Sequence, residues 1–381
     1  MRADQPRLVA VDARGYFTGG GTGRYTRNLV RELVSARTRD VALRLLISNQ
    51  HQPGDLEFPI DDDERGGSPP VRVVVSRAGW MNREEEDRWL EEEVADADLF
   101  HSLTGHWLPL GVPCVATLYD LTPLVRPRLV GAQARRLGRQ IADTVARASR
   151  LIVISHSTAR DARAVLGAAL PPMVMIPAAA APMFRPGVPA ADVLAAHALR
   201  RDDFLLTVSV LNPHKNLLRL VDAYAASGSG VPLVVAGAHR DDTGRIRAAI
   251  ERHRLEDRVR LVGRVTDQEL VALYGSCRAF IYPSLYEGFG LPVIEAMACG
   301  AAVVASRTSS IPEVAGDAAL LADPARTRSL AAAIRRIVHD DDLRDTLRRR
   351  AIVRAATFSW ARAAAATLGV YNGVLDARAA A

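Results

Sequence analysis

The stretch Tyr282–Gly300, YPSLYEGFGLPVIEAMACG, decides the fold. Its first tyrosine ends the apolar run AFIY at 279–282, which predicts a buried strand because the run is short, β-prone and followed by a proline. Pro292 suits the first turn of a helix, and residues 293–298 have helical propensity. The sequence therefore predicts a strand, a loop and a helix. The loop would lie at the carboxyl edge of a parallel sheet, where open α/β sheets bind ligands.

Two carboxylates in this stretch, Glu287 and Glu295, stand eight positions apart. Gly288 and Gly290 allow the backbone to approach a ligand closely, and the helix N-terminus offers N–H groups to a phosphate or a sugar oxygen. Carboxylates so placed can bind hydroxyl groups on two parts of one elongated ligand. The alternative is that Glu287 caps the helix and that Glu295 is a solvated helical side chain.

The motif E-x7-E within PSLYEGFGLPVIEAMACG, followed by AAVVASRTSSIPEVAGDAALLADP, resembles the donor-site signature of retaining family 4 glycosyltransferases. The chain is similar to bacterial mannosyltransferases of this family at several points along nearly its whole length. The resemblance implies an α/β fold of the GT-B architecture. That fold has two facing Rossmann-like domains with a cleft between them, and a C-terminal helix that crosses back to the first domain.

The composition is that of a globular chain, with 381 residues of which 49% are hydrophobic and 24% charged, enough for two domains. No apolar run approaches the roughly 18 residues of a transmembrane helix, and the N-terminus lacks the apolar segment of a signal peptide. Three scattered cysteines favour a reducing compartment over a disulfide framework or a zinc site. We therefore expect a cytoplasmic protein. The net charge of +6 is compatible with a diphosphate ligand.

The basic residues are almost all arginine. Of the 49 lysine and arginine residues, Lys215 alone is a lysine, which indicates a local need for a compact, strongly hydrated charge on a flexible stem. Chance retention is the alternative. Lys215 lies in PHKN rather than in the G-K-[ST] of a Walker A loop, which excludes a nucleotide hydrolase of that kind. A pyridoxal Schiff base could form only on this same lysine.

A strand at 8–12, a glycine-rich loop and a helix from about 24 to 36 predict the first unit of a nucleotide-binding-like domain. The glycines do not fit G-x-G-x-x-G, because that spacing would require glycine at Arg24, so a dinucleotide oxidoreductase is disfavoured. The stretch GGGTGRYTRNL resembles the N-terminal glycine loop of family 4 enzymes, which implies that Gly20 and Gly21 face the donor diphosphate. A tight strand-to-helix turn is the structural alternative.

Polar residues follow the predicted strands in DLFHSLTGHWLPLGVPCVATLYDLTPL, residues 98–124. His101 and Asp120 match the D-x-x-H and H-D-L segments of the resembled family, which implies that they line the acceptor or donor-sugar site and act in catalysis. Tyr119 stands where a second histidine is common, so a proton-handling role there is in doubt, although a tyrosine can still hydrogen-bond a sugar. His106 is a further polar candidate. For His101, a purely structural role is the alternative.

We expect residues 1–185 to form the first, acceptor-binding domain and 200–358 the donor-binding domain, with a last helix at about 359–381 packing back on the first. The Ala/Pro-rich residues 177–189 predict a linker. Three aspartates at 61–63 lie in a long polar loop with no strand feeding it, so we reject them as a metal-binding D-x-D.

An arginine-studded amphipathic helix is predicted at 131–150. Basic helices of this kind in the resembled family can lie on anionic membranes when the acceptor is a lipid, which makes peripheral contact at the inner membrane face one expectation. A solvated face is the simpler interpretation.

The second domain opens with FLLTVSVLNPHKNLLRLVDAY, residues 204–224, which predicts a strand, a turn and a helix with Lys215 in its first turn. The resemblance implies that P-x-K-N supplies the cation for the donor diphosphate, and His214 here replaces the usual arginine. Further on, Thr266 and Glu269 predict a capping box, and IPEVAG at 311–316 predicts a turn. By resemblance, the donor-binding residues are Gly20, Gly21, Ser209, His214, Val265, Gly288, Phe289, Gly290, Leu291 and Glu295, and the catalytic residues are Glu287, Lys215, His101 and Asp120.

The resemblance implies retaining sugar transfer that needs no metal and no cofactor. Lys215 and helix N–H groups would stabilise the departing diphosphate, and one of its oxygens would take the acceptor proton. Glu287 would bind donor-sugar hydroxyls, and Glu295 would hold the ribose. We expect a nucleotide-diphosphate hexose as donor, with GDP-mannose favoured. The acceptor would be a hydroxyl of a glycan, a lipid-linked sugar or a small molecule.

Three alternatives stay open at this point: a non-catalytic nucleotide-sugar sensor, and a nucleotide-sugar epimerase or a glycan synthase of the same fold. Nucleic-acid binding is disfavoured because the arginines lack interleaved aromatic residues. No obligate protein partner is expected.

Overall fold

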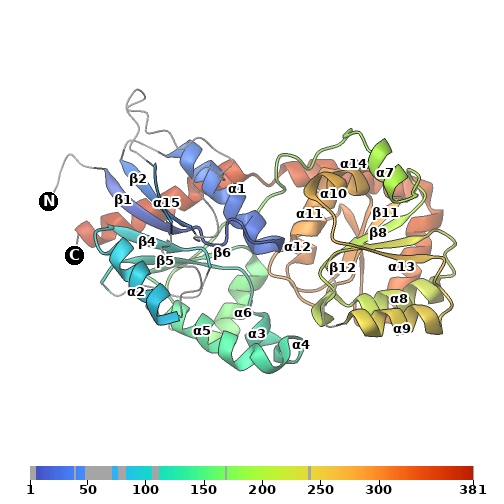
Figure 1. Ribbon diagram of the computed structural model, residues 1–381, viewed down its shortest axis with the longest axis horizontal. Coiled ribbons are helices and arrows are strands. Elements are labelled where there is room, and N and C mark those ends of the chain that lie inside the picture. The colour runs from blue at the N-terminus through green and yellow to red at the C-terminus, as the bar shows by residue number, and fades with distance from the viewer. Residues whose placement is uncertain are drawn as a thin grey trace. The chain divides into compact units, whose positions relative to one another are not determined.

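Two parallel β-sheets organise the chain in the computed structural model (Figure 1). The structure describes residues 6–37, 40–47, 71–75, 83–104, 111–167, 170–238 and 242–380. The predicted loop at 50–70 with its three aspartates, and His106, lie outside these residues. The chain divides into one unit of residues 1–125, 132–178 and 359–381 and a second unit of 126–131 and 179–358.

The sheet of the first unit has the strand order β3-β2-β1-β4-β5-β6-β7, and every described pair is parallel. The strand order reverses between β1 and β4, which creates a switch point at their carboxyl ends. The strands are β1 (Arg7–Asp12), β2 (Val41–Ile47), β3 (Val71–Val75), β4 (Leu99–Ser102), β5 (Cys114–Leu118), β6 (Arg150–Val153) and β7 (Met173–Met175).

Helices cover both faces of this sheet. Helix α15 (Trp360–Ala379) packs beside α1 (Gly20–Ala36), although the whole second unit separates them in the sequence. The opposite face carries α2 (Arg83–Val94) and α5 (Ala134–Arg147), as Figure 1 shows. The remaining described elements of this unit are the helices α3 (Thr122–Val125) and α6 (His156–Leu166) and, apart from its first residue, the 3₁₀ turn η2 (Gly131–Gln133).

The sheet of the second unit has the order β10-β9-β8-β11-β12-β13, and its switch point lies between β8 and β11. Its strands are β8 (Leu205–Val208), β9 (Leu233–Ala236), β10 (Val259–Gly263), β11 (Ala279–Tyr282), β12 (Val303–Ser306) and β13 (Ala319–Ala322).

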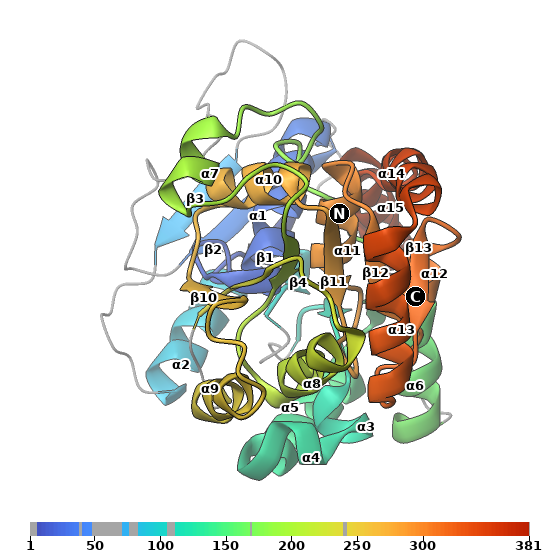
Figure 2. The ribbon, with the colours of Figure 1, turned by 90° about the vertical axis from the view of Figure 1, so that its right-hand side faces the viewer.

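The helices α8 (Leu217–Ser227), α9 (Thr243–Arg252) and α13 (Thr327–His339) gather on one face of this second sheet (Figures 1 and 2). The other face carries α7 (Ala191–Ala196), α10 (Asp267–Ser276), α11 (Leu291–Ala298) and α14 (Asp341–Ala356). Three short described elements also belong to this unit: the 3₁₀ turn η3 (Pro213–Lys215) and the helices α4 (Pro127–Val130) and α12 (Ile311–Ala315).

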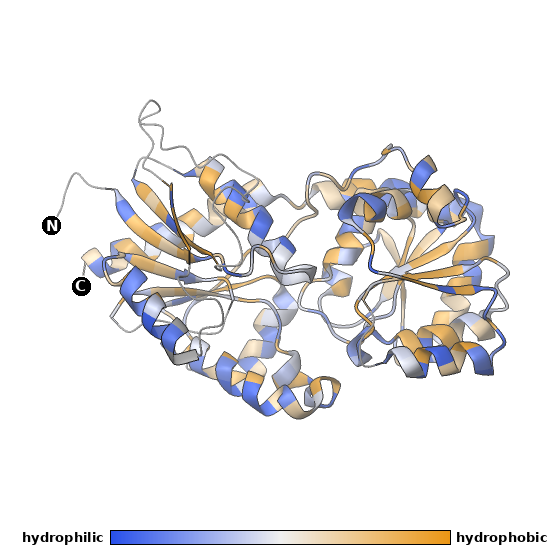
Figure 3. Cartoon of the chain, in the orientation of Figure 1, coloured by the Kyte–Doolittle hydropathy of each residue, from blue (hydrophilic) through white to orange (hydrophobic). Residues whose placement is uncertain are grey.

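The strands are mostly apolar because helices cover both sheet faces (Figure 3). All four residues of β11 are buried, as the AFIY run predicts. In the second unit, Leu220 of α8 and Ile334 of α13 belong to the same core as Ile281 of β11. This packing fixes the strand end from which the central loop departs.

Several predicted elements begin or end elsewhere than expected. Helix α1 begins at Gly20, so the predicted glycine loop is largely the first turn of the helix. Lys215 ends the 3₁₀ turn η3 and does not lie in the first turn of α8, because Asn216 adopts a left-handed conformation between them. The predicted turn at 311–316 is the helix α12. The capping box is confirmed, with both of its hydrogen bonds present between Thr266 and Glu269.

Candidate functional site

The loop between β11 and α11 is held in shape by its backbone neighbours. Gly290 has φ +100°, a left-handed conformation, and a Cβ added there would lie 2.4 Å from Cδ1 of Ile311. The hydroxyl of Ser310 lies 2.9 Å from the carbonyl oxygens of both Glu287 and Phe289. The N–H of Glu287 donates to Oγ of Ser309 at 3.0 Å. The serines that precede α12 therefore position the carboxylate loop.

Glu287 is the centre of a polar cluster at the switch point of the second sheet. Its Oε1 accepts hydrogen bonds from Nζ of Lys215 at 2.6 Å, from the hydroxyl of Tyr282 at 2.7 Å and from Oγ of Ser284 at 2.6 Å. Nζ of Lys215 also donates to the Tyr282 hydroxyl at 3.0 Å. The lysine and glutamate side chains are 14% and 13% exposed, so the ion pair is mostly shielded from water.

The electrostatics of this cluster favour an ionised carboxylate. Burial by itself would raise the pKa of Glu287, but the charge and hydrogen bond of Lys215 and the hydroxyl of Ser284 lower this pKa overall. Burial raises the pKa of Tyr282 well above its usual value, and the neighbouring Glu287 raises it further. The cluster thus combines a neutral phenol with a lysine–glutamate ion pair.

The structure excludes the two simpler interpretations of the glutamates. The N-cap of α11 is Gly290, with no side-chain cap, so Glu287 does not cap the helix. Glu295 lies on the second turn of α11 and is 1% exposed, so it is not a solvated side chain. Phe289 is 4% exposed, and Leu291 is the first residue of α11. The roles of these residues in donor binding stay predictions.

Three further predicted donor-binding residues follow strands of the same sheet. Ser209 comes directly after β8, and Val265 follows β10 by two residues. Since the carboxyl ends of parallel strands share one edge, both lie at the edge that carries Glu287. His214 contributes its backbone here, because its carbonyl oxygen accepts from the N–H of Leu285 at 2.8 Å. Its imidazole, which replaces an expected arginine, is partly buried.

At the switch point of the first sheet lies an ion pair that the sequence reasoning missed. Asp12, the last residue of β1, is 0% exposed, and its two carboxylate oxygens accept from Nε and Nη2 of Arg14 at 2.8 and 2.9 Å. The hydroxyl of Thr104 donates to the same carboxylate. Burial would raise the pKa of Asp12, but Arg14 lowers it overall. The D-x-R at residues 12–14, which begins with the last residue of β1, is the sequence signal that could have indicated this ion pair.

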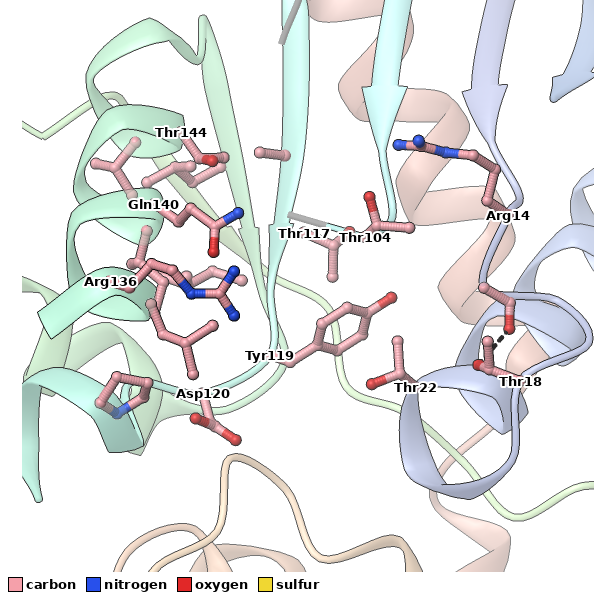
Figure 4. Close-up of a pocket in the computed structure, with 18 of the residues that line it drawn as sticks. Arg14, Thr18, Thr22, Thr104, Thr117, Tyr119, Asp120, Arg136, Gln140 and Thr144 are labelled. Carbon is pink, nitrogen blue, oxygen red and sulfur yellow. Dashed lines mark hydrogen bonds between the residues drawn. The ribbon is translucent and has the colours of Figure 1, made fainter. Parts of the chain in front are cut away.

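A cavity of about 780 Å³ opens beside this ion pair within the first unit (Figure 4). Arg136, Gln140 and Thr144 reach it from successive turns of α5. Their spacing of four residues places them on one helix face. This spacing is a signal in the sequence that could have indicated the cavity wall. The other polar lining residues are Arg14, Thr18, Thr22, Asp87, Thr104, Thr117, Tyr119 and Asp120.

The predicted residues of the first unit are distributed unevenly around this cavity. Asp120 lines it, and its Oδ1 accepts from the N–H of Thr122 at 2.9 Å. Gly20 and Gly21 are exposed in the first turn of α1, while the adjacent Gly19 lines the cavity. The predicted contact of Gly20 and Gly21 with a diphosphate stays a prediction.

His101 is fully buried and is not among the lining residues. Its Nδ1 lies 2.6 Å from the hydroxyl of Tyr371 on α15, and its Nε2 lies 2.8 Å from Oγ1 of Thr117. Burial lowers the pKa of His101 to about 3, so the imidazole is neutral. This placement supports a positioning role, because His101 fixes the Thr117 side chain that faces the cavity. A catalytic role for His101 stays a prediction.

Within the described ranges, no group of three or more His, Cys, Asp and Glu side chains is gathered in a way that could hold a metal ion. Nor is any described helix long and apolar enough to cross a membrane.

Comparison with known proteins matches two parts of the chain to glycosyltransferase families. Residues 19–180 match the family Glycosyltransferase Family 4, and residues 195–354 match Glycosyl transferases group 1. A D-inositol 3-phosphate glycosyltransferase of Kineococcus radiotolerans is 32% identical over 326 residues, which cover 74% of this chain and 73% of that enzyme. The chain belongs to the family 4 glycosyltransferases.

An O-antigen chain mannosyltransferase B of Escherichia coli is 36% identical over 184 residues, 47% of this chain. The matched part spans 48% of that enzyme, about half its length. Among solved structures, a sucrose-phosphate synthase of Thermosynechococcus elongatus superposes with a TM-score of 0.78 over 97% of this glycosyltransferase chain and 100% of its own, at 23% identity. The predicted GT-B architecture is therefore confirmed, as is the resemblance to bacterial mannosyltransferases.

Proposed function

We propose that this family 4 protein is a retaining, metal-independent glycosyltransferase that moves a hexosyl group, with mannose favoured, from a nucleotide-diphosphate sugar to an acceptor hydroxyl. The second unit would hold the donor. The observation that carries the proposal is the contact of Lys215 and Glu287 at the switch point of the second sheet, 2.6 Å apart and joined by Tyr282. That edge is where open α/β sheets bind nucleotides.

The cluster has bonding capacity left for a donor. An ammonium carries three N–H donors, and within the described residues two of those of Lys215 go to Tyr282 and Glu287. The third can bind a phosphate oxygen while the lysine stays in place. The bonds that Glu287 accepts from side chains go to Oε1, so Oε2 can accept from a sugar hydroxyl. The two groups would thus hold the phosphate and sugar ends of one donor.

This arrangement supports departure of the diphosphate by electrostatic stabilisation. In the proposed reaction the bond between the anomeric carbon and the diphosphate oxygen breaks, and Lys215 stabilises the charge that develops on that oxygen. The acceptor oxygen bonds to the anomeric carbon on the same face, and its proton passes to a diphosphate oxygen. Retention follows from attack on the face that the leaving group vacates. Mannose as the sugar rests on the similarity to mannosyltransferases.

The decisive experiment measures transfer and donor hydrolysis with GDP-mannose, UDP-glucose and ADP-glucose for the wild type and for Glu287→Gln. We expect one donor to be turned over with retention, and at least a hundred-fold loss in kcat for the variant. Glu256→Gln, at an exposed glutamate of the same unit, is the matched control and should keep full activity. Full activity of Glu287→Gln would overturn the proposal. Donor binding without any turnover would favour the sensor, and sugar isomerisation without transfer the epimerase.

A further inference from the structure

We propose that Asn216 is a positioning residue for glycosyl transfer: its side-chain amide and its left-handed backbone hold Lys215 within reach of Glu287 and of the donor diphosphate. The inference rests on the proposed function, in which Lys215 stabilises the departing diphosphate, and adds to it a residue that acts through this lysine. It is carried by the hydrogen bonds that join the residues on both sides of Lys215 to the segment 283–285, which leads to Glu287.

The first argument is the backbone of Asn216. It has φ 59° and ψ 29°, a left-handed conformation, and it separates the 3₁₀ turn η3 from helix α8. Among residues other than glycine, asparagine is one of those that tolerate this conformation best. The left-handed residue ends η3 at Lys215, and α8 begins at Leu217. The lysine side chain therefore leaves the backbone from the turn and not from the helix.

The second argument is the side-chain amide of Asn216. The residue is 8% exposed, and its Nδ2 donates to the carbonyl oxygen of Pro283 at 3.1 Å and to that of Pro324 at 2.7 Å. Both hydrogen bonds are buried, so these carbonyl groups depend on partners within the protein. Pro283 follows β11 and Pro324 follows β13. One amide thus ties the loop that contains Lys215 to two other loops at the carboxyl edge of the sheet.

The third argument is that the lysine is held on both sides. The carbonyl oxygen of His214 accepts from the N–H of Leu285 at 2.8 Å, and the amide of Asn216 binds the carbonyl oxygen of Pro283. The residues before and after the lysine are thus bonded to the same short segment, which ends two residues before Glu287. The backbone positions from which the ammonium and the carboxylate extend are therefore fixed relative to each other.

Such support matters because a lysine side chain is long and flexible. Holding its ammonium in one position costs conformational entropy. The ammonium reaches Tyr282 at 3.0 Å and Glu287 at 2.6 Å only when the backbone at the base of the side chain is in place. A displacement of about 1 Å at a catalytic group can lower a rate roughly hundred-fold. Loss of the Asn216 amide should therefore reduce turnover, although it leaves the groups proposed to touch the donor unchanged.

The test compares Asn216→Gly, which keeps the left-handed backbone and removes the amide, with Asn216→Ala, which disturbs both. With the donor that the wild type turns over, we expect kcat to fall about ten-fold for the glycine variant and about a hundred-fold for the alanine variant. The acidic limb of kcat/KM should also move to higher pH in both, because a more distant Lys215 lowers the pKa of Glu287 less. A smaller fraction of folded enzyme would not move that limb.

A second readout needs no turnover. Lys215 is the chain's one lysine, so acylation of its amine by an N-hydroxysuccinimide ester can be followed by mass spectrometry of a single peptide. The lysine side chain is 14% exposed and paired with Glu287, which should make this reaction slow in the wild type. We expect labelling to be about five-fold faster in the folded Asn216→Gly protein, because the loop that contains Lys215 opens more often.

Arg254→Ala is the matched control, because Arg254 also has a positive φ, 54°, and is exposed in the same unit. It should keep the wild-type kcat and the wild-type labelling rate. Donor turnover by none of the proteins would count against the proposed function, and labelling would then decide the role of Asn216 by itself. Wild-type kcat and labelling in Asn216→Gly would overturn the inference. A lower kcat with an unmoved acidic limb and unchanged labelling would overturn it too.

Discussion

Nζ of Lys215 lies 2.6 Å from Oε1 of Glu287, although the two residues are 72 positions apart in the sequence. Lys215 follows β8 and Glu287 follows β11, and these strands are neighbours at the point where the strand order reverses. The fold therefore joins the chain's one lysine to the first glutamate of E-x7-E. Tyr282, the last residue of β11, bonds to both and closes a triangle of polar atoms.

Lys215→Met should destabilise the second unit, because it leaves the shielded carboxylate of Glu287 without its counter-ion. We expect a loss of about 3 kcal/mol in the free energy of unfolding at pH 7.5. Paired Glu287 has a lowered pKa, so in the wild type its contribution is present above the unfolded pKa and fades as the pH falls through the folded pKa. In the variant, burial without the lysine would raise the pKa of Glu287. The difference in the free energy of unfolding between wild type and variant should therefore become smaller as the pH falls toward 5.

The double variant Lys215→Met/Glu287→Gln provides the control for this effect. A neutral amide in place of the carboxylate removes the unpaired charge, so most of the lost stability should return. Urea unfolding followed by amide hydrogen exchange in β8 and β11 reports on the second unit alone. If the double variant is no more stable than Lys215→Met, the ion pair is not the source of the loss.

Tyr282→Phe should shift the acidic limb of the pH profile of kcat/KM toward higher pH. The Tyr282 hydroxyl donates to the ionised form of Glu287 at 2.7 Å, and removing a donor to the charged form raises the pKa of that carboxylate. The charged and titratable groups around it are Lys215, His214, Glu295 and Tyr274, all of which the variant keeps. Steady-state rates between pH 5 and 9 test this. An unshifted acidic limb with a uniformly lower rate would point to a packing effect.

Gly290→Ala should destabilise the carboxylate loop for two separable reasons. The residue has φ +100°, which an L side chain rarely adopts, and the new Cβ would lie 2.4 Å from Cδ1 of Ile311. We expect a loss of more than about 1 kcal/mol. Adding Ile311→Val removes Cδ1 and should restore the steric part only.

Gly369→Ala on α15 is the control, because nothing lies within 4 Å of a Cβ there and its backbone is helical. Alanine should be neutral or slightly stabilising at that position. Thermal unfolding of Gly290→Ala, Gly290→Ala/Ile311→Val and Gly369→Ala tests both parts of this explanation. A Gly290→Ala protein as stable as Gly369→Ala would contradict the strained-loop explanation.

The loop between β11 and α11 could be predicted from sequence because its signals are local. The AFIY run, Pro292 and the glycines each act within a few residues, and β11 has the predicted bounds 279–282. The position of Lys215 was predicted less well. Proline at 213 and the left-handed Asn216 replace the expected helical first turn by a 3₁₀ turn, a choice that local propensity does not determine.

The first unit shows where sequence reasoning failed. Asp12 ends β1 and Arg14 follows it by two positions, so their ion pair is local in the sequence. The contact of Asp12 with Thr104 is not local, because it depends on the pairing of β1 with β4. The four-residue spacing of Arg136, Gln140 and Thr144 on α5 is visible in the sequence and places them on one helix face. Only the tertiary fold shows that this face borders a cavity rather than solvent. His101 was singled out as polar at a strand end, whereas its partner Tyr371 is 270 residues away.

His101→Gln should flatten the acid sensitivity of the first unit. The folded pKa of His101 is about 3 because of burial, against about 6.5 when unfolded. Between these values the unfolded chain binds a proton that the folded chain does not, so wild-type stability falls as the pH falls through this window. The loss between pH 7.5 and 5 should be about 2 kcal/mol, and the variant should lack it. Trp89 and Trp360 are buried in this unit, so their fluorescence follows its urea unfolding. His156→Gln, at an exposed histidine on α6, is the matched control and should keep the wild-type pH dependence. An equal slope in His101→Gln and wild type would mean that His101 is protonated in the folded state, which the complete burial of its imidazole opposes.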